Sequence, residues 1–100
     1  MLYAIFGEDI SDSLRLRREA RPAHQARLKA LQAEGRLVIA GPFPSIDAPD
    51  PGPAGFSGSL IVAEFDSLAA AKAWAETDPY IVSGAYANTV VKPFRQIFPQ

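Results

Sequence analysis

The chain has 100 residues, 48% of them hydrophobic and 21% charged, a composition typical of packed globular proteins. It therefore predicts a single domain over residues 1–100. Ten basic and eleven acidic residues leave a net charge of -1, too little positive charge to expect nucleic acid as the main partner. The absence of cysteine excludes disulfides, thiolate metal sites and a thiol nucleophile.

The start of the chain shows no targeting or membrane segment. Its apolar residues 2–6 are followed by an acidic pair, and no basic stretch precedes them. No apolar run approaches the ~18 residues that a membrane span needs. We therefore expect a cytoplasmic protein that does not contact membranes.

The first third of the chain predicts a strand and two helical segments. Residues 2–7 are short, apolar and aromatic-rich, which favours a buried strand. Ser11 or Asp12 can cap the first helical segment, and a break or kink is expected before Pro22 because proline disfavours helix in the preceding residue. The second segment begins at Pro22 and ends at Gly35.

The remaining elements are strands and short helices. Residues 36–44 predict a strand that is apolar on both faces, and its Gly-Pro-Phe-Pro end is not expected to continue a central strand. Residues 45–57 predict a long surface loop that could cover a site. After it come, in order, a strand over 58–65, a helix capped by Ser67, a short helical piece starting at Asp78-Pro79, and an edge or bulged strand over 86–98.

The order β-α-β-β-α-β predicts an α+β fold, the ferredoxin-like plait, with four antiparallel strands and both helices on one face of the sheet. The other face is then bare. Because the second and third strands are apolar on both faces, the bare face would expose a larger apolar patch than soluble monomers usually tolerate. We therefore expect a homodimer packed sheet to sheet.

His24 is the only histidine, which excludes metal sites built on several imidazoles. With Leu28 and Leu31 it falls on one helical face, where a lone histidine is more often a hydrogen-bonded core residue. Asp78 is the best carboxylate partner, although Asp-Pro at a helix start also serves as a cap. An aspartate within reach would fix the imidazole tautomer and stabilise its cationic form, giving an acid-base dyad.

Binding residues are predicted more weakly. Four arginines, at positions 15, 17, 18 and 21, read as a solvated face, except that Arg21 lies close to His24 and could bind a small anion. The backbone at Gly41-Pro42 could approach a ligand, and Phe43, Phe56 and Tyr80 could line a pocket, although aromatic side chains are more often core. Because no nucleotide, zinc, hydrolase or calcium motif is present, we expect no cofactor and no metal.

Several short motifs along nearly the whole chain resemble the YciI-like (YCII-related) family. They are Met1-Leu2-Tyr3, Arg21-Pro22-Ala23-His24 with Arg27-Leu28, Glu34-Gly35-Arg36-Leu37, Ala40-Gly41-Pro42, Asp50-Pro51-Gly52 leading to Ala54-Gly55-Phe56, Ala63-Glu64-Phe65, Ala73-Trp74-Ala75, Asp78-Pro79-Tyr80 and Val91-Lys92-Pro93-Phe94. The resemblance implies a ferredoxin-like fold of the dimeric α+β barrel group and an active site containing His24 and Asp78. One related member is a dehydrochlorinase of a hydroxyquinol, and muconolactone isomerases share the superfamily fold.

The leading hypothesis is a cofactor-free lyase or isomerase acting on a small, aromatic or enolisable anion. In it His24 moves the proton, Asp78 orients the imidazole, and Arg21 with backbone near Gly41 steadies negative charge. Asp78 as the base itself stays open. Two alternatives also stay open: a dimeric module that binds a metabolite or regulates without turnover, and a structural dimerisation domain with an incidental polar pair.

Overall fold

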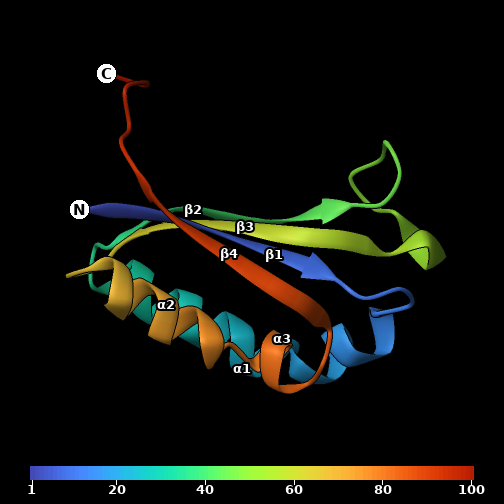
Figure 1. The fold of residues 1–100 in the computed structure, drawn as a ribbon. Helices are drawn as coiled ribbons and strands as arrows, with labels where there is room; N and C mark the ends of the chain where they lie inside the picture. The colour runs from blue at the N-terminus through green and yellow to red at the C-terminus, as the bar shows by residue number, and fades with distance from the viewer.

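The computed structural model describes residues 1–100 as a four-stranded antiparallel sheet with helices on one face (Figure 1). Its elements are β1 (Leu2–Asp9), α1 (Leu14–Ala33), β2 (Leu37–Pro44), the 3-10 turn η1 (Gly52–Ala54), β3 (Phe56–Glu64), α2 (Leu68–Glu76), α3 (Pro79–Val82) and β4 (Tyr86–Phe94). The strand order β2-β3-β1-β4 confirms the predicted plait. No helix is long and apolar enough to cross a membrane.

The predicted break at Pro22 is wrong, because α1 continues through it as one helix of 20 residues. A proline inside a helix costs about 3 kcal/mol. The buried residues of α1 lie on both sides of the proline: Arg17 before it, and His24 and Leu31 after it. Packing of this one continuous helix face outweighs the local cost of the proline. The helix ends as predicted, with Gly35 at a φ of 73° and the Arg36 N–H donating to the Leu31 carbonyl.

Of the two edge strands, β2 agrees with the prediction and β4 is shorter than predicted. β2 covers Leu37–Pro44, close to the predicted 36–44, and it includes Pro42 because it is an edge strand, where a missing N–H deprives no outer neighbour of a bond. β4 ends at Phe94 and not at residue 98. Phe94 lies opposite Leu2, where β1 begins, so no neighbouring strand remains for later residues to pair with.

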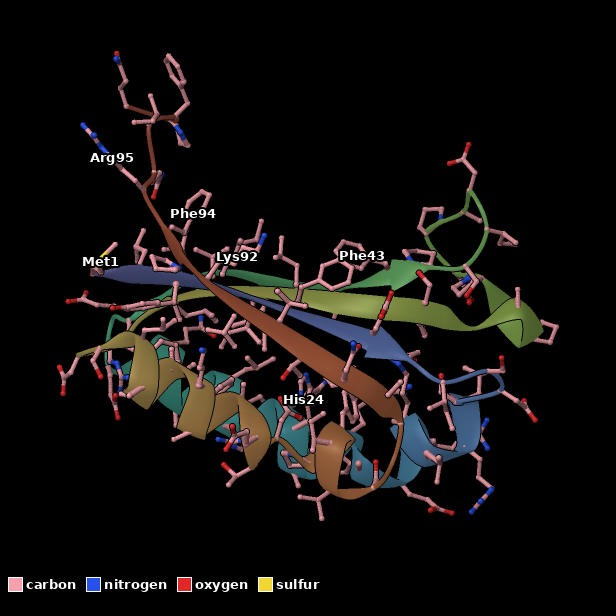
Figure 2. The ribbon with its side chains drawn as sticks, in the orientation of Figure 1. Met1, His24, Phe43, Lys92, Phe94 and Arg95 are labelled. Carbon is pink, nitrogen blue, oxygen red and sulfur yellow. The ribbon has the colours of Figure 1, made fainter.

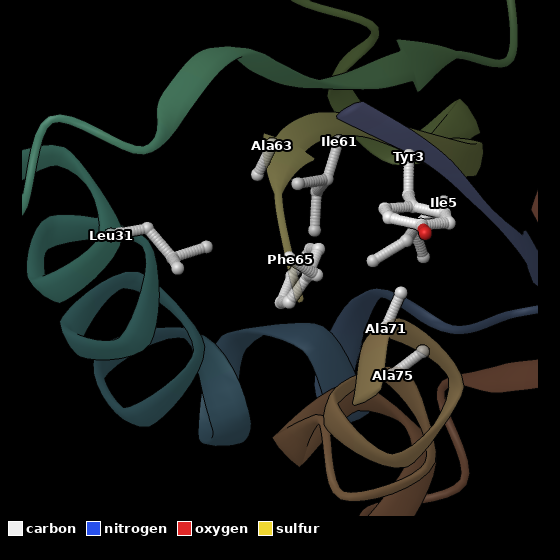
Figure 3. Close-up of a cluster of buried hydrophobic side chains, with 8 residues drawn as sticks. All are labelled: Tyr3, Ile5, Leu31, Ile61, Ala63, Phe65, Ala71 and Ala75. Carbon is white, nitrogen blue, oxygen red and sulfur yellow. The ribbon is translucent and has the colours of Figure 1, made fainter. Parts of the chain in front are cut away.

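The main core fills the space between the sheet and helices α1 and α2 (Figure 3). It consists of Tyr3 and Ile5 from β1, Ile61 and Ala63 from β3, Phe65, Leu31 from α1, and Ala71 and Ala75 from α2. The two alanines allow α2 to lie close to the sheet, and the Ser67 hydroxyl caps the helix by accepting the Ala70 N–H, as predicted. Both helices therefore lie on one face, with α3 against α1.

The opposite face of the sheet carries no helix (Figure 2). Large apolar side chains lie on it, among them Phe6, which is 40% exposed, and Phe94. Phe43 packs against Phe6 with ring centroids 5.3 Å apart. His24 lies on the other side, between the sheet and the helices, so the candidate site and the open face are separated by the sheet.

Candidate active site

His24 and Asp78 meet in the structure, although they are far apart in the sequence. The His24 Nδ1 lies 2.9 Å from Asp78 Oδ1 and 3.1 Å from Oδ2, and both residues are buried. Because a carboxylate accepts, Nδ1 carries the donated proton and Nε2 stays available to a ligand. The same Oδ1 accepts the Tyr80 N–H at 2.8 Å, so Asp78 is both the α3 cap and the histidine partner.

Tyr80 fixes the plane of the imidazole. Its ring stacks on His24 with centroids 4.0 Å apart and an angle of 14° between the planes. Tyr80 is buried, and it follows Asp78 within the same short helix. One turn of chain therefore orients the imidazole in two ways, by a hydrogen bond at its edge and by a ring against its face.

A cavity of about 490 Å³ opens beside His24, between α1, β2, β3 and the loop that precedes β3. Of the residues predicted to bind substrate or to react, the wall lacks Asp78 and also Phe43, which lies on the open face of the sheet; it includes Arg21, His24, Gly41, Pro42, Phe56 and Tyr80. Asp78 lies outside the wall, where it supports His24. Residues 50–52 of the long loop also border the cavity, as predicted for a loop that could cover a site.

The cavity carries unpaired positive charge. Arg18 and Arg21 line it from the exposed side of α1. Neither takes part in any of the four ion pairs of the protein. The one acidic side chain in the wall, Asp50, accepts the Gly52 N–H at 3.0 Å. Two free guanidinium groups against one carboxylate favour an anionic ligand.

Arg17 corrects the expectation of a solvated basic face, because it is only 3% exposed. Its Nε and Nη2 donate to Asp9 at 2.6 and 2.8 Å, and Nη2 also donates to the Gly58 carbonyl and the Ser59 hydroxyl, each at 3.0 Å. The Ser13 hydroxyl donates to the same Asp9 carboxylate. Burial alone would lower the pKa of Arg17, but the bonds and charge of Asp9 outweigh it and raise that pKa above its ordinary value.

Three aromatic rings surround the Arg17 guanidinium, whose carbon lies 5.1 Å from the Phe56 ring, 4.9 Å from Tyr80 and 5.6 Å from Tyr86. Phe56 and Tyr80 are also cavity walls. Arg17 thus holds together the aromatic side of the cavity. The spacing of Arg17 could have revealed its burial, because residues 17, 24 and 31 recur every seven positions on the buried face of α1.

The ring of Tyr86, the third aromatic ring around Arg17, packs directly against the backbone of Gly7 in β1. A Cβ on Gly7 would lie 2.5 Å from Cε2 of the Tyr86 ring, so the ring occupies the space of the missing side chain. Burial raises the pKa of the Tyr86 phenol to about 12. The phenol is therefore a neutral group at physiological pH.

Arg27, three residues after His24 on α1, supports the segment that leads into Asp78. Its Nη2 donates to the Trp74 carbonyl at 2.8 Å and to the Thr77 hydroxyl at 3.2 Å, and its guanidinium carbon lies 4.2 Å from the Trp74 ring. Burial lowers the pKa of Arg27, and the charge of Asp78 opposes that shift. Arg27 therefore fixes the end of α2 that leads into Asp78.

Comparisons with known proteins agree with this fold. The profile of the YCII-related domain matches residues 1–95. Protein YciI of Escherichia coli is 55% identical over 98 residues, which cover 98% of this chain and 100% of that one. An uncharacterised protein of Haemophilus influenzae is 52% identical over the same share of each chain.

Among solved structures, one similar chain is the 5-chloro-2-hydroxyhydroquinone dehydrochlorinase of Burkholderia phenoliruptrix in complex with 2,5-dihydroxybenzoquinone. The TM-score is 0.82 at 27% sequence identity, covering 95% of this chain and 94% of that one. The whole plait is therefore common to the two proteins, including the elements that carry His24 and Asp78.

Removing the buried cation should destabilise the protein strongly. In Arg17→Met the Asp9 carboxylate, 1% exposed, stays buried without its partner, and we expect a loss of about 3 to 5 kcal/mol in the free energy of unfolding. The control is Arg15→Met, which removes an exposed ion pair with Glu19 and should cost at most about 1 kcal/mol. Urea unfolding measures both, and equal losses would contradict the role of Arg17.

The raised pKa of Tyr86 predicts a specific alkaline weakness. The unfolded chain loses this proton near pH ~10, whereas the folded protein keeps it until pH is about 12. Between these values the unfolded state binds fewer protons, so the stability that the protonated phenol contributes is lost as pH rises. The free energy of unfolding, measured in urea from pH 9 to 11, should fall more steeply for the wild type than for Tyr86→Phe. Parallel curves would rule this out.

Proposed function

The chain belongs to the family of proteins with a YCII-related domain, and on that premise we propose that it is an acid-base enzyme of the lyase or isomerase type. Residues 1–100 act as one domain. The proposed substrate is a small, planar, enolisable or phenolic anion. The observation that carries the proposal is the buried His24–Asp78 hydrogen bond, which leaves the second imidazole nitrogen at the wall of a cavity.

In this proposal His24 transfers the proton, and Asp78 positions the His24 imidazole. Asp78 holds the proton on Nδ1 and stabilises the imidazolium that forms when Nε2 takes a proton from the substrate. We assign the base role to His24 and not to Asp78, because the Asp78 side chain is nearly inaccessible and its Oδ1 already accepts from His24 and from the Tyr80 N–H.

The substrate class follows from the rest of the wall. Arg18 and Arg21 supply positive charge for an oxyanion or carboxylate, and backbone near Gly41 steadies charge that develops on the substrate. Phe56 and Tyr80 offer flat surfaces suited to a planar molecule. Support also comes from the similar dehydrochlorinase, since its ligand 2,5-dihydroxybenzoquinone is a planar, acidic enol.

We further propose that the partner of the chain is a second copy, packed sheet to sheet. The support is the apolar outer face, where Phe6, Val90 and Phe94 are exposed to a degree unusual for large apolar side chains. A two-fold arrangement would place this face against itself and remove it from water.

Proton transfer can be tested without knowing the natural substrate. The probe is 2,5-dihydroxybenzoquinone in D₂O, whose ring C–H exchanges through the keto tautomer and disappears from the proton NMR spectrum. We expect the wild type to accelerate this exchange, and His24→Gln to reduce the acceleration by about 10² to 10⁴ while changing the Kd by less than about threefold. Asp78→Asn should also slow exchange, whereas Gln32→Ala, an exposed change on α1, should not.

Three results would contradict the proposed function in different ways. Equal exchange rates for the wild type and His24→Gln would remove His24 from the chemistry. Binding without any accelerated exchange would favour a metabolite-binding module. Failure of the wild type to bind the probe, seen by calorimetry, would reject the proposed substrate class.

The proposed dimer predicts the molecular mass in solution and a residue whose substitution should dissociate the two copies. Light scattering at micromolar concentration should give twice the chain mass of 10.8 kDa. Phe6→Lys should yield monomers, because it places a charge at the centre of the apolar face. Val82→Lys is the matched control, since Val82 is 77% exposed in α3 on the helical side. A monomeric wild type would reject the dimer.

A further inference from the structure

The last residues of the chain, 95–100, form an extension that we call the C-terminal arm. It begins after Phe94 and projects from the sheet on the side away from the helices (Figure 1). Its one hydrogen bond lies within the arm, from the Gln96 side chain to the Pro99 carbonyl at 3.5 Å. Nothing in the fold of its own chain therefore holds the arm in place.

The arm carries two large apolar side chains into water. Ile97 is 54% exposed and Phe98 is 73% exposed. Removing such side chains from water is favourable, so their exposure favours a contact that covers them. They lie three and four residues after Phe94, which belongs to the open face, so the arm carries them outward from the border of that face.

The open face has a hollow that suits such side chains. It has a volume of about 350 Å³ and is lined by Ala4, Phe6, Leu60, Val90 and Lys92. Its surface is apolar except at Lys92. The arm cannot fill the hollow of its own chain, because it leads away from the sheet that contains it.

We infer that the C-terminal arm is a clasp between two copies of the chain, which packs Ile97 and Phe98 against the open sheet face of the partner. This inference rests on the proposed sheet-to-sheet dimer. Six extended residues span about 20 Å, whereas two stacked sheets lie about 10 Å apart. The arm is therefore long enough to cross the space between the sheets and to contact the second one.

The surfaces favour a second copy as the occupant. Two-fold symmetry gives each arm the other copy's face, so one sequence supplies both halves of the contact. Charge is complementary as well: the arm carries one charged residue, Arg95, and the exposed acidic groups Glu8 and Glu64 lie on β1 and β3, at the ends of the apolar face. A free tail would need neither apolar side chain.

The test compares the double variant Ile97→Ser/Phe98→Ser with the wild type by sedimentation velocity over a dilution series. Because each dimer contains two arms, we expect the dimer Kd to rise at least about tenfold. Val82→Ser, an equally exposed apolar residue on the helical side, should change the Kd by less than about twofold. Isotope-filtered NOEs in a mixture of labelled and unlabelled chains should connect the Phe98 ring to Val90 methyl groups of the other copy.

The outcomes separate the clasp from the dimer itself. If Phe6→Lys dissociates the dimer but the double variant leaves the Kd unchanged, the dimer stands and the clasp is wrong. If intermolecular NOEs to Phe98 are absent from an intact dimer, the clasp is wrong for the same reason. If the wild type is monomeric, both proposals fall together.

Discussion

The buried ion pair between Arg17 and Asp9 is the constraint on which the rest of the structure depends. A charged group inside a protein must be paired and hydrogen-bonded, because the cost of taking it out of water is otherwise several kcal/mol. Arg17 meets that requirement by reaching groups on β1 and β3 and aromatic rings on β3, α3 and β4. One side chain of α1 thereby fixes the helix relative to three strands and the short helix.

The geometry of the candidate site follows from this placement. His24 lies two turns after Arg17 on the same buried face, so fixing one sets the height and rotation of the other. Tyr80 touches both, with its ring against the imidazole and near the guanidinium. Asp78, which bonds His24, starts the helix that carries the Tyr80 ring. The single turn of α3 therefore supplies both the carboxylate that bonds the imidazole and the ring that stacks on it.

Much of the fold could be predicted because apolar periodicity and the Ser67 and Asp78 caps agree with the tertiary structure. The prediction fails where tertiary structure overrides a local rule: at Pro22 inside α1, and at β4, whose end depends on where β1 begins. Arg17 was missed because charged residues are so often exposed. For Asp78, cap and histidine partner were weighed as alternatives, yet its oxygens perform both roles, which residue type alone cannot reveal.

The prolines at the sheet edges have a consequence for assembly. Both outer strands contain them, Pro42 and Pro44 in β2 and Pro93 in β4. A proline has no N–H to offer an incoming strand, and a sheet protected in this way resists the edge-to-edge stacking that leads to ribbons and aggregates. Growth of the sheet sideways is therefore discouraged at both borders, so the sheet keeps its width of four strands.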